Sequence, residues 1–410
     1  TGILSTTARE LAVGRITRLF RYEQTSGLIV IAAVLLALVA ANSPLAEIYA
    51  LVHHTPVHFR FGPLVIDGPL VQWINEGLMV IFFLVVGLEI KRQLLEGHLA
   101  SYKRAALPVF AALGGMTFPA VIYASLNWAD PIALRGWAIP TATDIVLALG
   151  VLSLLGSRVP VSLRIFLTAL AIFDDIGAVI VVGFFYGEPL SVMPLLVAGL
   201  AILALILINR FRVVLPAAYI VVGLVLWVAM LKSGVEAALA GVFIALAVPL
   251  HVSDSKVSSP LRHTERRLHA WNVLLVVPLF AFFNAGITID SAADSWPLET
   301  VSLGVIAGLC VGKQIGIFCA SRAAVATGLA QLPEGITWTQ LYGAALLSGI
   351  GFTMSTFVAT LAFDDLELIS SAKLSILIGS LLSASAGLTV IRLSTATKIV
   401  RGAKALSSGK

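Results

Sequence analysis

Charged residues are scarce in this sequence: they make up 12% of its 410 residues, whereas 59% are hydrophobic and the mean hydropathy is +0.98. Soluble domains of ordinary composition carry about 25% charged residues. A soluble protein needs polar side chains to cover its surface, and too few are present here. The composition therefore excludes an ordinary soluble protein and predicts one whose surplus apolar surface faces lipid.

Cysteine is also nearly absent, because Cys310 and Cys319 are the only two and both lie in one apolar segment. We therefore expect no disulfide framework. The net charge is +5 and the pI about 9.3. Membrane proteins usually carry such an excess in their cytoplasmic loops, so we do not expect nucleic-acid binding. No cofactor is predicted.

Long apolar runs are what the sequence does contain. In lipid every backbone N–H and C=O group must be hydrogen-bonded within the protein, and continuous rather than alternating runs favour helices over a barrel. Spans of about 20 residues then predict about twelve segments, near residues 25–43, 69–90, 105–125, 136–155, 160–186, 189–209, 213–230, 234–250, 270–287, 301–324, 339–363 and 371–393. The seventh and eighth are short, so one of them could be tilted or interfacial.

Lysine and arginine concentrate in every second loop, a pattern that marks the cytoplasmic side. The loops between them are mainly acidic, with Arg60 and Arg135 as exceptions. Both termini are therefore predicted to be cytoplasmic, which requires an even number of spans. Residues 1–24 would form a cytoplasmic segment, residues 25–393 the transmembrane domain and residues 394–410 a cytoplasmic tail.

One loop on the opposite side, residues 44–68, has the pattern of a β-hairpin. Residues 57–68 alternate around the turn signal Gly62-Pro63. An unstructured loop is the alternative. The edge of a hairpin could pair with a second copy of the chain, so the loop also suggests a homodimer.

The fourth segment contains the sequence Ala138-Ile-Pro-Thr-Ala-Thr-Asp144. A charge at the bilayer centre costs at least about 2.5 kcal/mol, so Asp144 needs an explanation. Because Pro140 removes a helix hydrogen bond, we expect an interrupted helix, with the Asp144 carboxylate offsetting the positive ends of half-helices. A proline kink with a buried capping aspartate is the alternative.

Asp174 and Asp175 are adjacent in the fifth segment. Neighbouring residues on a helix point about 100° apart, so the two carboxylates face different neighbours. Two close carboxylates can hold a proton near neutral pH and release it when a cation arrives. We interpret the pair as the centre of an ion site, because ionisable groups inside a membrane are usually functional.

Lys313 lies within the tenth segment and is the natural ionic partner for one of these aspartates. The alternative is a lysine whose side chain extends to the membrane interface. In segment eleven, Ser348-Gly-Ile-Gly-Phe-Thr-Met-Ser355 favours local unwinding but also fits close helix packing. Interrupted helices in corresponding positions of two halves indicate a transporter site, so the breaks in segments four and eleven strengthen each other.

The remaining charges in or beside the segments are peripheral: Glu76, Glu89, Glu236, Glu265 and His269. Glu89 lies near Lys91 and Arg92, so a salt bridge there is as good an explanation as a functional role. Histidine titrates near neutral pH, so His269 is a candidate pH sensor.

At these residues the sequence resembles the NhaA family of bacterial sodium/proton antiporters. The resemblance rests on residues 138–144, 169–178, 312–313 and 349–355, with further matches at 73–75, 86–92 and 231–234, and runs over nearly the whole chain. It implies an all-α polytopic protein of the bacterial inner membrane with twelve helices. Segments three to five and ten to twelve would form inverted repeats, whose interrupted helices cross near the midplane.

The resemblance also implies roles for individual residues. Asp174 and Asp175 would bind Na⁺ or Li⁺, with Asp175 as the principal ligand and Thr143 beside them. Lys313 would be the charge and proton partner of Asp174, and Asp144 would compensate charge at the helix crossing. A role in pH regulation would fall to Glu89, Glu236, Glu265 and His269.

Several positions depart from the pattern of the best-known member of that family. Glu236 stands in place of a histidine, Arg266 in place of the first histidine of the cytoplasmic cluster, and Gln314 in place of a proline. Glu265 and His269 of that cluster remain. The residues of the ion site match, so these departures bear on the pH set point and not on the ion site.

The resulting hypothesis is an electrogenic antiporter, not an enzyme, that exchanges cytoplasmic Na⁺ or Li⁺ for external H⁺ at one site, for sodium extrusion and pH homeostasis. An intramembrane aspartyl protease is one alternative, but its two aspartates lie on separate helices and its Gly-x-Gly-Asp motif is absent here. A proton-channelling subunit of a redox complex is the other, and it would require partner subunits.

Overall fold

The computed structural model describes residues 25–62, 64–96, 102–156, 159–187, 190–213, 215–250, 259–287 and 300–408. These ranges are mainly α-helical, and each of the predicted membrane segments coincides with a helix or a helix pair. The predicted all-α polytopic membrane fold is therefore confirmed. The predicted cytoplasmic segment 1–24 lies outside the described residues.

Seven helices of the described chain are long and apolar enough to cross a membrane. They are α3 (Leu70–Glu96), α4 (Tyr102–Asn127), α7 (Val161–Phe185), α8 (Val192–Arg210), the continuous run of α11 (Pro260–Trp271), η4 (Asn272–Val276) and α12 (Val277–Ala285), the run of α14 (Thr300–Ala307), η5 (Gly308–Gly312) and α15 (Lys313–Ala326), and α18 (Leu366–Ser408).

Three bent helix pairs raise the number of candidate spans to ten. They are Thr25–Ala41 with α2 (Ala46–His54), the run of α5 (Pro131–Leu134) and η2 (Arg135–Thr141) with α6 (Ile145–Ser153), and α16 (Trp338–Leu347) with α17 (Phe352–Ala362). The predicted seventh and eighth segments form α9 (Pro216–Leu231) and α10 (Leu239–Ala247), which are too short to reach that criterion. Helices of 16 and 9 residues extend only about 24 and 14 Å.

Polar side chains at the helix starts explain several boundaries. The Asp130 carboxylate accepts the N–H of Ile132 at 2.8 Å and caps α5. Thr337 and Gln340 form a reciprocal capping box at the start of α16. Ser259 caps α11, which begins with a proline. Each cap satisfies backbone N–H groups that have no partner within their own helix.

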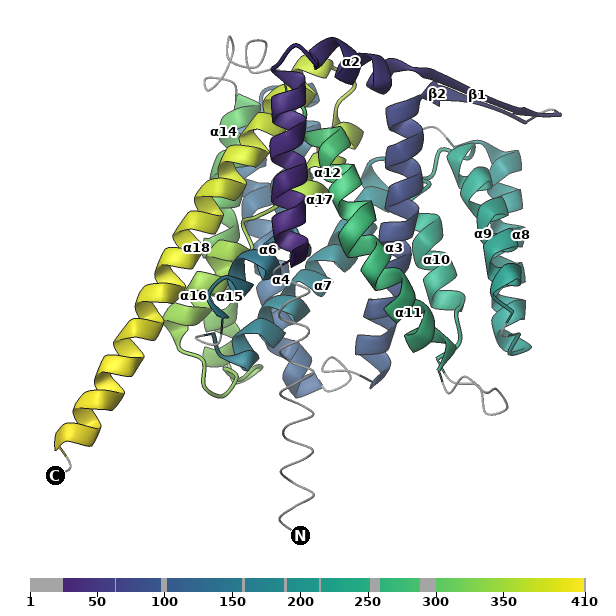
Figure 1. Ribbon diagram of the computed structural model, residues 1–410. Coiled ribbons are helices and arrows are strands. Elements are labelled where there is room, and N and C mark those ends of the chain that lie inside the picture. Colours follow the sequence, from purple (N-terminus) through teal and green to yellow (C-terminus); the bar gives the residue numbers. More distant parts are fainter. Residues whose placement is uncertain are drawn as a thin grey trace.

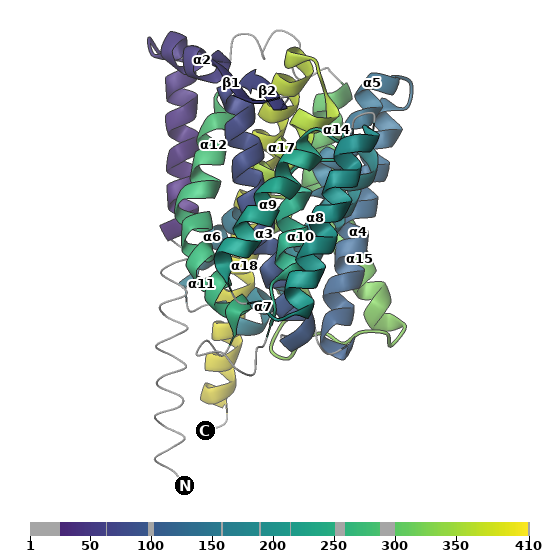
Figure 2. The same ribbon diagram turned by 90° about the vertical axis from the view of Figure 1, so that its right-hand side faces the viewer.

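The helices run between two faces of the molecule (Figures 1 and 2). The start of the helix Thr25–Ala41 and the end of α18 point toward one face, whereas α2 and the hairpin lie at the other. In the hairpin, β1 (Pro56–Phe61) pairs antiparallel with β2 (Leu64–Pro69), and Gly62 at the turn has φ of 59°. The alternation in the loop therefore indicated a real hairpin, which projects past α9 in Figure 1.

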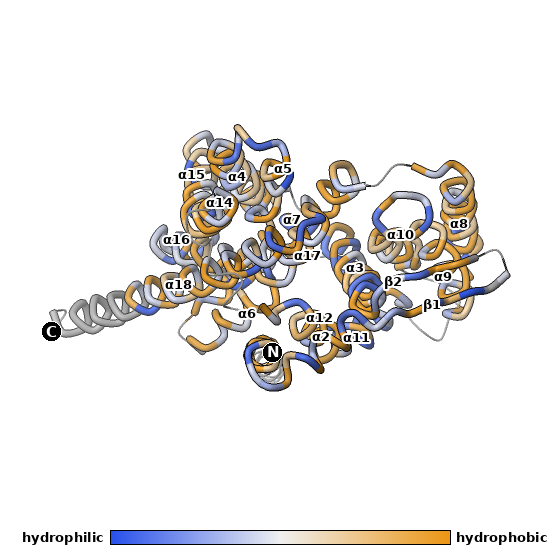
Figure 3. Tube along the Cα trace, turned by 90° about the horizontal axis from the view of Figure 1, so that it is seen from above, coloured by the Kyte–Doolittle hydropathy of each residue, from blue (hydrophilic) through white to orange (hydrophobic). Residues whose placement is uncertain are grey.

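Helices α8 and α9 lie at the periphery and expose many large apolar side chains. Figure 3 shows hydrophobic residues along both helices. Examples with more than half of their surface exposed are Leu196, Leu200, Ile206, Ile220 and Leu224. A water-facing surface would not carry such a continuous apolar face, so these side chains contact lipid.

Helices α4 and α15 approach closely because glycines occupy their contact. A Cβ atom at Gly316 would lie 2.1 Å from the Gly114 carbonyl oxygen, and one at Gly114 would lie 2.2 Å from that of Gly316. Small residues permit this separation between helices in a membrane. The contact holds α15, which begins at Lys313, against α4.

Replacing Gly316 by valine will force α4 and α15 apart. We expect the thermal unfolding temperature in detergent to fall by several degrees, because overpacking typically costs about 1–3 kcal/mol. Gly199→Val on α8 is the matched control, since no atom lies within 4 Å of a Cβ at that position. Equal unfolding temperatures for the two variants would show that the glycine contact is unimportant.

Candidate functional site

The two interrupted helices meet at their breaks. The chain bends by 42° between η2 and α6 and by 45° between α16 and α17. The backbone N–H of Asp144 donates to the Ile350 carbonyl at 2.6 Å, and the Ser355 hydroxyl donates to the Ile139 carbonyl at 2.7 Å. Each break therefore satisfies backbone groups freed in the other, as burial away from water requires.

The glycines of the second break serve close packing as well as unwinding. A Cβ atom at Gly349 would lie 2.5 Å from the Leu309 carbonyl oxygen. Gly351 ends the break, and its N–H donates to the Ser380 hydroxyl at 3.3 Å. The local unwinding and the close helix packing predicted for residues 348–355 therefore occur together.

The Asp144 carboxylate bridges the starts of two half-helices. One oxygen accepts the N–H of Leu147 at 2.9 Å, in the first turn of α6. The other accepts both the N–H and the hydroxyl of Thr353, at 3.0 and 2.7 Å, in the first turn of α17. Both helix starts carry partial positive charge, which a carboxylate at this position offsets. Asp144 is therefore a capping aspartate for two helices at once.

Lys313 and Asp174 form a buried ion pair. The Lys313 Nζ lies 2.9 Å from Asp174 Oδ2, and both side chains are 0% exposed. The Thr143 hydroxyl donates to the same Asp174 oxygen at 2.5 Å, and its oxygen also lies 3.0 Å from the Ser348 carbonyl oxygen. Lys313 also donates to the backbone carbonyl of Thr141. The structure thus brings Thr143, Asp174 and Lys313 together, and a lysine extending to the membrane interface is excluded.

A π-helical turn precedes Lys313 directly. This turn, η5, spans Gly308–Gly312 and packs against prolines: a Cβ at Gly308 would lie 2.5 Å from Pro140, and one at Gly312 would lie 2.7 Å from Pro119. Such turns are frequent at functional sites, because they change the direction of the side chains that follow. Here the turn sets the position of Lys313 beside the crossing.

Carboxylate oxygens without donors remain beside this ion pair. Among the described residues, Asp174 Oδ1 is buried and has no hydrogen-bond partner, and Asp175 is only 2% exposed. Within the described chain no group donates a hydrogen bond to the Asp175 carboxylate, which interacts electrostatically with Asp174, Asp144, Glu89 and Lys313. A buried carboxylate without donors is costly unless a proton or a cation neutralises it. Hard cations prefer such oxygen ligands.

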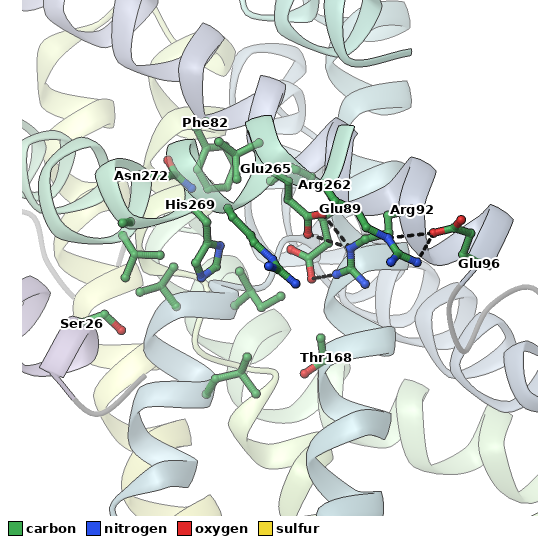
Figure 4. Close-up of a pocket in the computed structure, with 18 residues that line it drawn as sticks. Ser26, Phe82, Glu89, Arg92, Glu96, Thr168, Arg262, Glu265, His269 and Asn272 are labelled. Atoms are coloured by element: carbon green, nitrogen blue, oxygen red, sulfur yellow. Dashed lines mark hydrogen bonds and ion pairs between the residues drawn. The ribbon is translucent and has the colours of Figure 1, made fainter. Parts of the chain in front are cut away.

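A cavity of about 660 Å³ opens between α3, α6, α7 and the α11–η4 run. Its lining includes Ile145 and Val146, which directly follow Asp144, together with Glu89, Glu265 and His269 (Figure 4). Charged residues of α3 and α11 face one another across it, in the ion pairs Arg92–Glu265 at 2.7 Å and Arg262–Glu96 at 2.6 Å. Within α3, Arg92 also lies 3.9 Å from Glu89, one turn earlier. The cavity therefore extends from a charged mouth toward the helix crossing.

The structure separates the four residues that were predicted to regulate pH response. Glu89, Glu265 and His269 line the cavity, whereas Glu236 lies between α9 and α10 and is not part of its lining. Arg92 pairs with Glu89, as the alternative of a salt bridge there predicted, and it also pairs with Glu265, which the sequence did not indicate. Thr353 was likewise not singled out, although a hydroxyl directly after a predicted break is a typical partner for a buried carboxylate.

Two interrupted helices that cross within a membrane bundle, with buried ionisable groups beside the crossing, define a secondary transporter. The chain belongs to the family described as Na⁺/H⁺ antiporter 1, which matches residues 17–391. The resemblance predicted from the motifs is therefore confirmed.

Curated relatives match over most of their length. The Na⁺/H⁺ antiporter NhaA of Rhodospirillum rubrum is 49% identical over 387 residues, covering 92% of this chain and 97% of that protein. NhaA 2 of Pseudomonas syringae pv. syringae is 50% identical and covers 93% and 95%, and NhaA of Nitratiruptor sp. is 48% identical and covers 93% and 99%. These relatives give no support to the protease or to the redox-complex subunit.

Proposed function

We propose that this protein is a Na⁺/H⁺ antiporter that exchanges cytoplasmic Na⁺ for external H⁺, for sodium extrusion and pH homeostasis. The observation that carries the proposal is the pair of buried carboxylates, Asp174 and Asp175, which have oxygens free of donors beside the helix crossing. The names of relatives about half identical in sequence support the same assignment.

The proposed exchange is competition between Na⁺ and protons for one site. Na⁺ enters through the cavity and binds Asp175 and the free oxygen of Asp174, with the Thr143 hydroxyl and backbone carbonyls completing an oxygen shell. Lys313, released from Asp174, gives up a proton and takes it back when the ion pair forms again. Protons entering from the opposite side displace the cation. More protons than cations move in each cycle, so transport is electrogenic.

Asp144 is assigned to charge compensation at the crossing, because its carboxylate faces the starts of α6 and α17. The two repeats of the transmembrane domain are assigned from the order of long and broken helices. A long helix, a broken pair and a second long helix occur twice, as α4, α5–α6, α7 and as α14–α15, α16–α17, α18. We assign these two sets as inverted repeats, and a two-fold superposition of the sets tests the relation.

The proposal also covers the membrane in which the protein lies, the side of its termini and its assembly into a dimer. The protein is assigned to the bacterial inner membrane because its relatives are bacterial antiporters. Both termini are assigned to the cytoplasm because Lys and Arg are concentrated in every second loop, and because the described chain ends lie on one face (Figure 1). Labelling of single cysteines at residue 400 and in the hairpin, from each side of the membrane, tests this. The hairpin, whose strands each have an open edge, is assigned to a homodimer contact; deletion of residues 56–69 should yield monomers.

The cavity residues Glu89, Glu265 and His269 are assigned to the pH response, and Glu236 would act separately from them. Li⁺ is expected as a second substrate because it is also a small hard cation. Cation profiles at several pH values test both assignments, since Glu265→Gln should shift the pH profile and leave the cation preference unchanged.

The purified chain alone in proteoliposomes tests the function. A Na⁺ pulse should release protons from the lumen, an equal K⁺ pulse should not, and an imposed membrane potential should change the rate. Dependence on additional subunits would support the redox-complex alternative. Equal responses to Na⁺ and K⁺ would contradict the proposal.

A further inference from the structure

Helix α2 covers the end of α12 on the hairpin face. It turns by 105° from the helix Thr25–Ala41 and lies across that face (Figures 1 and 2). The Tyr49 hydroxyl donates to the Phe282 carbonyl at 2.7 Å, and His53 Nε2 lies 2.7 Å from the Phe283 carbonyl. Both carbonyls belong to the last turn of α12, where they have no partner within the helix. Helix α2 therefore caps the C-terminus of α12.

The space for this cap is built into the sequence. A Cβ atom at Gly286, directly after α12, would lie 2.3 Å from atoms of the Tyr49 ring. The rings of Tyr49 and His53 lie 4.2 Å apart, and His53 also lies 5.6 Å from the ring of Phe283. The imidazole is thus held in one orientation by tilted ring contacts and by its two polar contacts.

Both ring nitrogens of His53 face groups that only accept hydrogen bonds. Besides the Phe283 carbonyl at Nε2, the Tyr49 carbonyl lies 2.8 Å from Nδ1. A neutral imidazole has a single N–H, so one nitrogen would direct a lone pair at a carbonyl oxygen, whereas the imidazolium donates to both. The negative end of the α12 dipole also favours a cation at this position.

We propose that His53, through its two acceptor contacts, forms a clasp between α2 and α12 that depends on protonation. When it is protonated it fastens α2 onto the end of α12, and when it loses its proton one contact becomes repulsive and α2 loosens. Other titratable groups near the clasp are Glu47, Tyr49 and His54 on α2 and Glu76 on α3, whereas α12 carries none. Burial raises the pKa of Tyr49 to about 12, so its hydroxyl stays protonated from pH 5 to pH 9. On the adjoining hairpin, His58 and Asp67 pair with each other at 2.9 Å, and Arg60 lies on β1.

The clasp reaches the transport machinery through one continuous run of helix. Helix α12 follows η4 and α11, and residues of α11 and η4 line the cavity that opens on the opposite face. Protons on the side of the hairpin therefore change the contacts of α12, and α12 is the end of the helical run whose other end lines the cavity. This inference rests on contacts of the described chain and does not require the proposed antiport.

Hydrogen exchange of the full chain in lipid nanodiscs tests the clasp. Backbone exchange of residues 46–54 is measured from pH 5 to pH 9 and divided by the intrinsic rate at each pH. We expect protection of this helix to fall roughly three- to thirtyfold in the parent chain as the pH rises from 5 to 9. His53→Gln, which can donate but does not titrate, should show no such fall.

His54→Gln is the matched control, because it removes the neighbouring histidine of the same helix, and it should behave like the parent. Tyr49→Phe loses the other capping bond but keeps His53, so protection should be lower and still depend on pH. A parent chain without pH dependence in residues 46–54, or a His53→Gln variant that follows the parent, would overturn the proposal. The readout is structural, so loss of transport activity cannot be mistaken for loss of the clasp.

Discussion

An Asp175→Asn variant will lose sodium-driven proton exchange almost completely, by roughly a hundredfold or more. Asp175 is 2% exposed, and within the described chain no hydrogen-bond donor reaches its carboxylate. An amide has nearly the same size but carries no negative charge, so it can neither neutralise a buried cation nor exchange a proton with it. The fold should survive, because the substitution removes a buried charge that has no donors.

Proteoliposomes with a pH-sensitive dye measure this loss, and thermal unfolding shows that the variant is folded. Glu76→Gln is the matched control: it also replaces a carboxylate of a membrane helix, but Glu76 contacts Gln72 on α3, away from the crossing. The control should exchange Na⁺ for H⁺ at the parent rate. An Asp175→Asn variant that retained Na⁺/H⁺ exchange would contradict the assignment of the ion site.

Breaking the ion pair of Lys313 and Asp174 from one side only will strongly destabilise the protein. The side chains of both residues are 0% exposed. The Lys313→Met variant leaves the Asp174 carboxylate buried without its cation, and the Asp174→Asn variant leaves the Lys313 ammonium buried without its anion. Leaving a buried charge uncompensated costs about 3–5 kcal/mol, whereas replacing both partners together is often nearly neutral. The double variant Asp174→Asn/Lys313→Met should therefore be more stable than either single variant, although inactive.

A double-mutant cycle on the free energy of unfolding measures the coupling between the two residues. The hydrogen-bonded pair Ser302 and Ser371, whose hydroxyls are 2.8 Å apart and buried between α14 and α18, supplies the matched cycle with alanine. We expect that neutral pair to couple by only about 1 kcal/mol. Similar coupling energies in the two cycles would argue against a charged pair. Acidification should reduce the penalty in Lys313→Met, because a proton can then neutralise Asp174.

Much of the fold could be predicted from the sequence, because hydropathy and helix breaking are local properties. Apolar runs located every membrane helix, Pro140 marked the break before α6, and alternation around Gly62 marked the hairpin. The seventh and eighth segments were already short in the sequence, but only the folded chain shows that their helices, α9 and α10, have 16 and 9 residues. Interior charges likewise predicted the residues of the candidate site, because lipid makes each of them costly.

Tertiary structure alone decided which groups meet. That Asp144 serves two helix starts through Thr353, and that Thr143 shares an Asp174 oxygen with Lys313, depends on contacts between residues far apart in the chain. The same holds for the cavity, which gathers Glu89 and Glu265. From the residues themselves, the sequence determined that charges lie inside the membrane and where helices break. Packing decided their partners, because distances across the bundle depend on how helices cross, which no local pattern specifies.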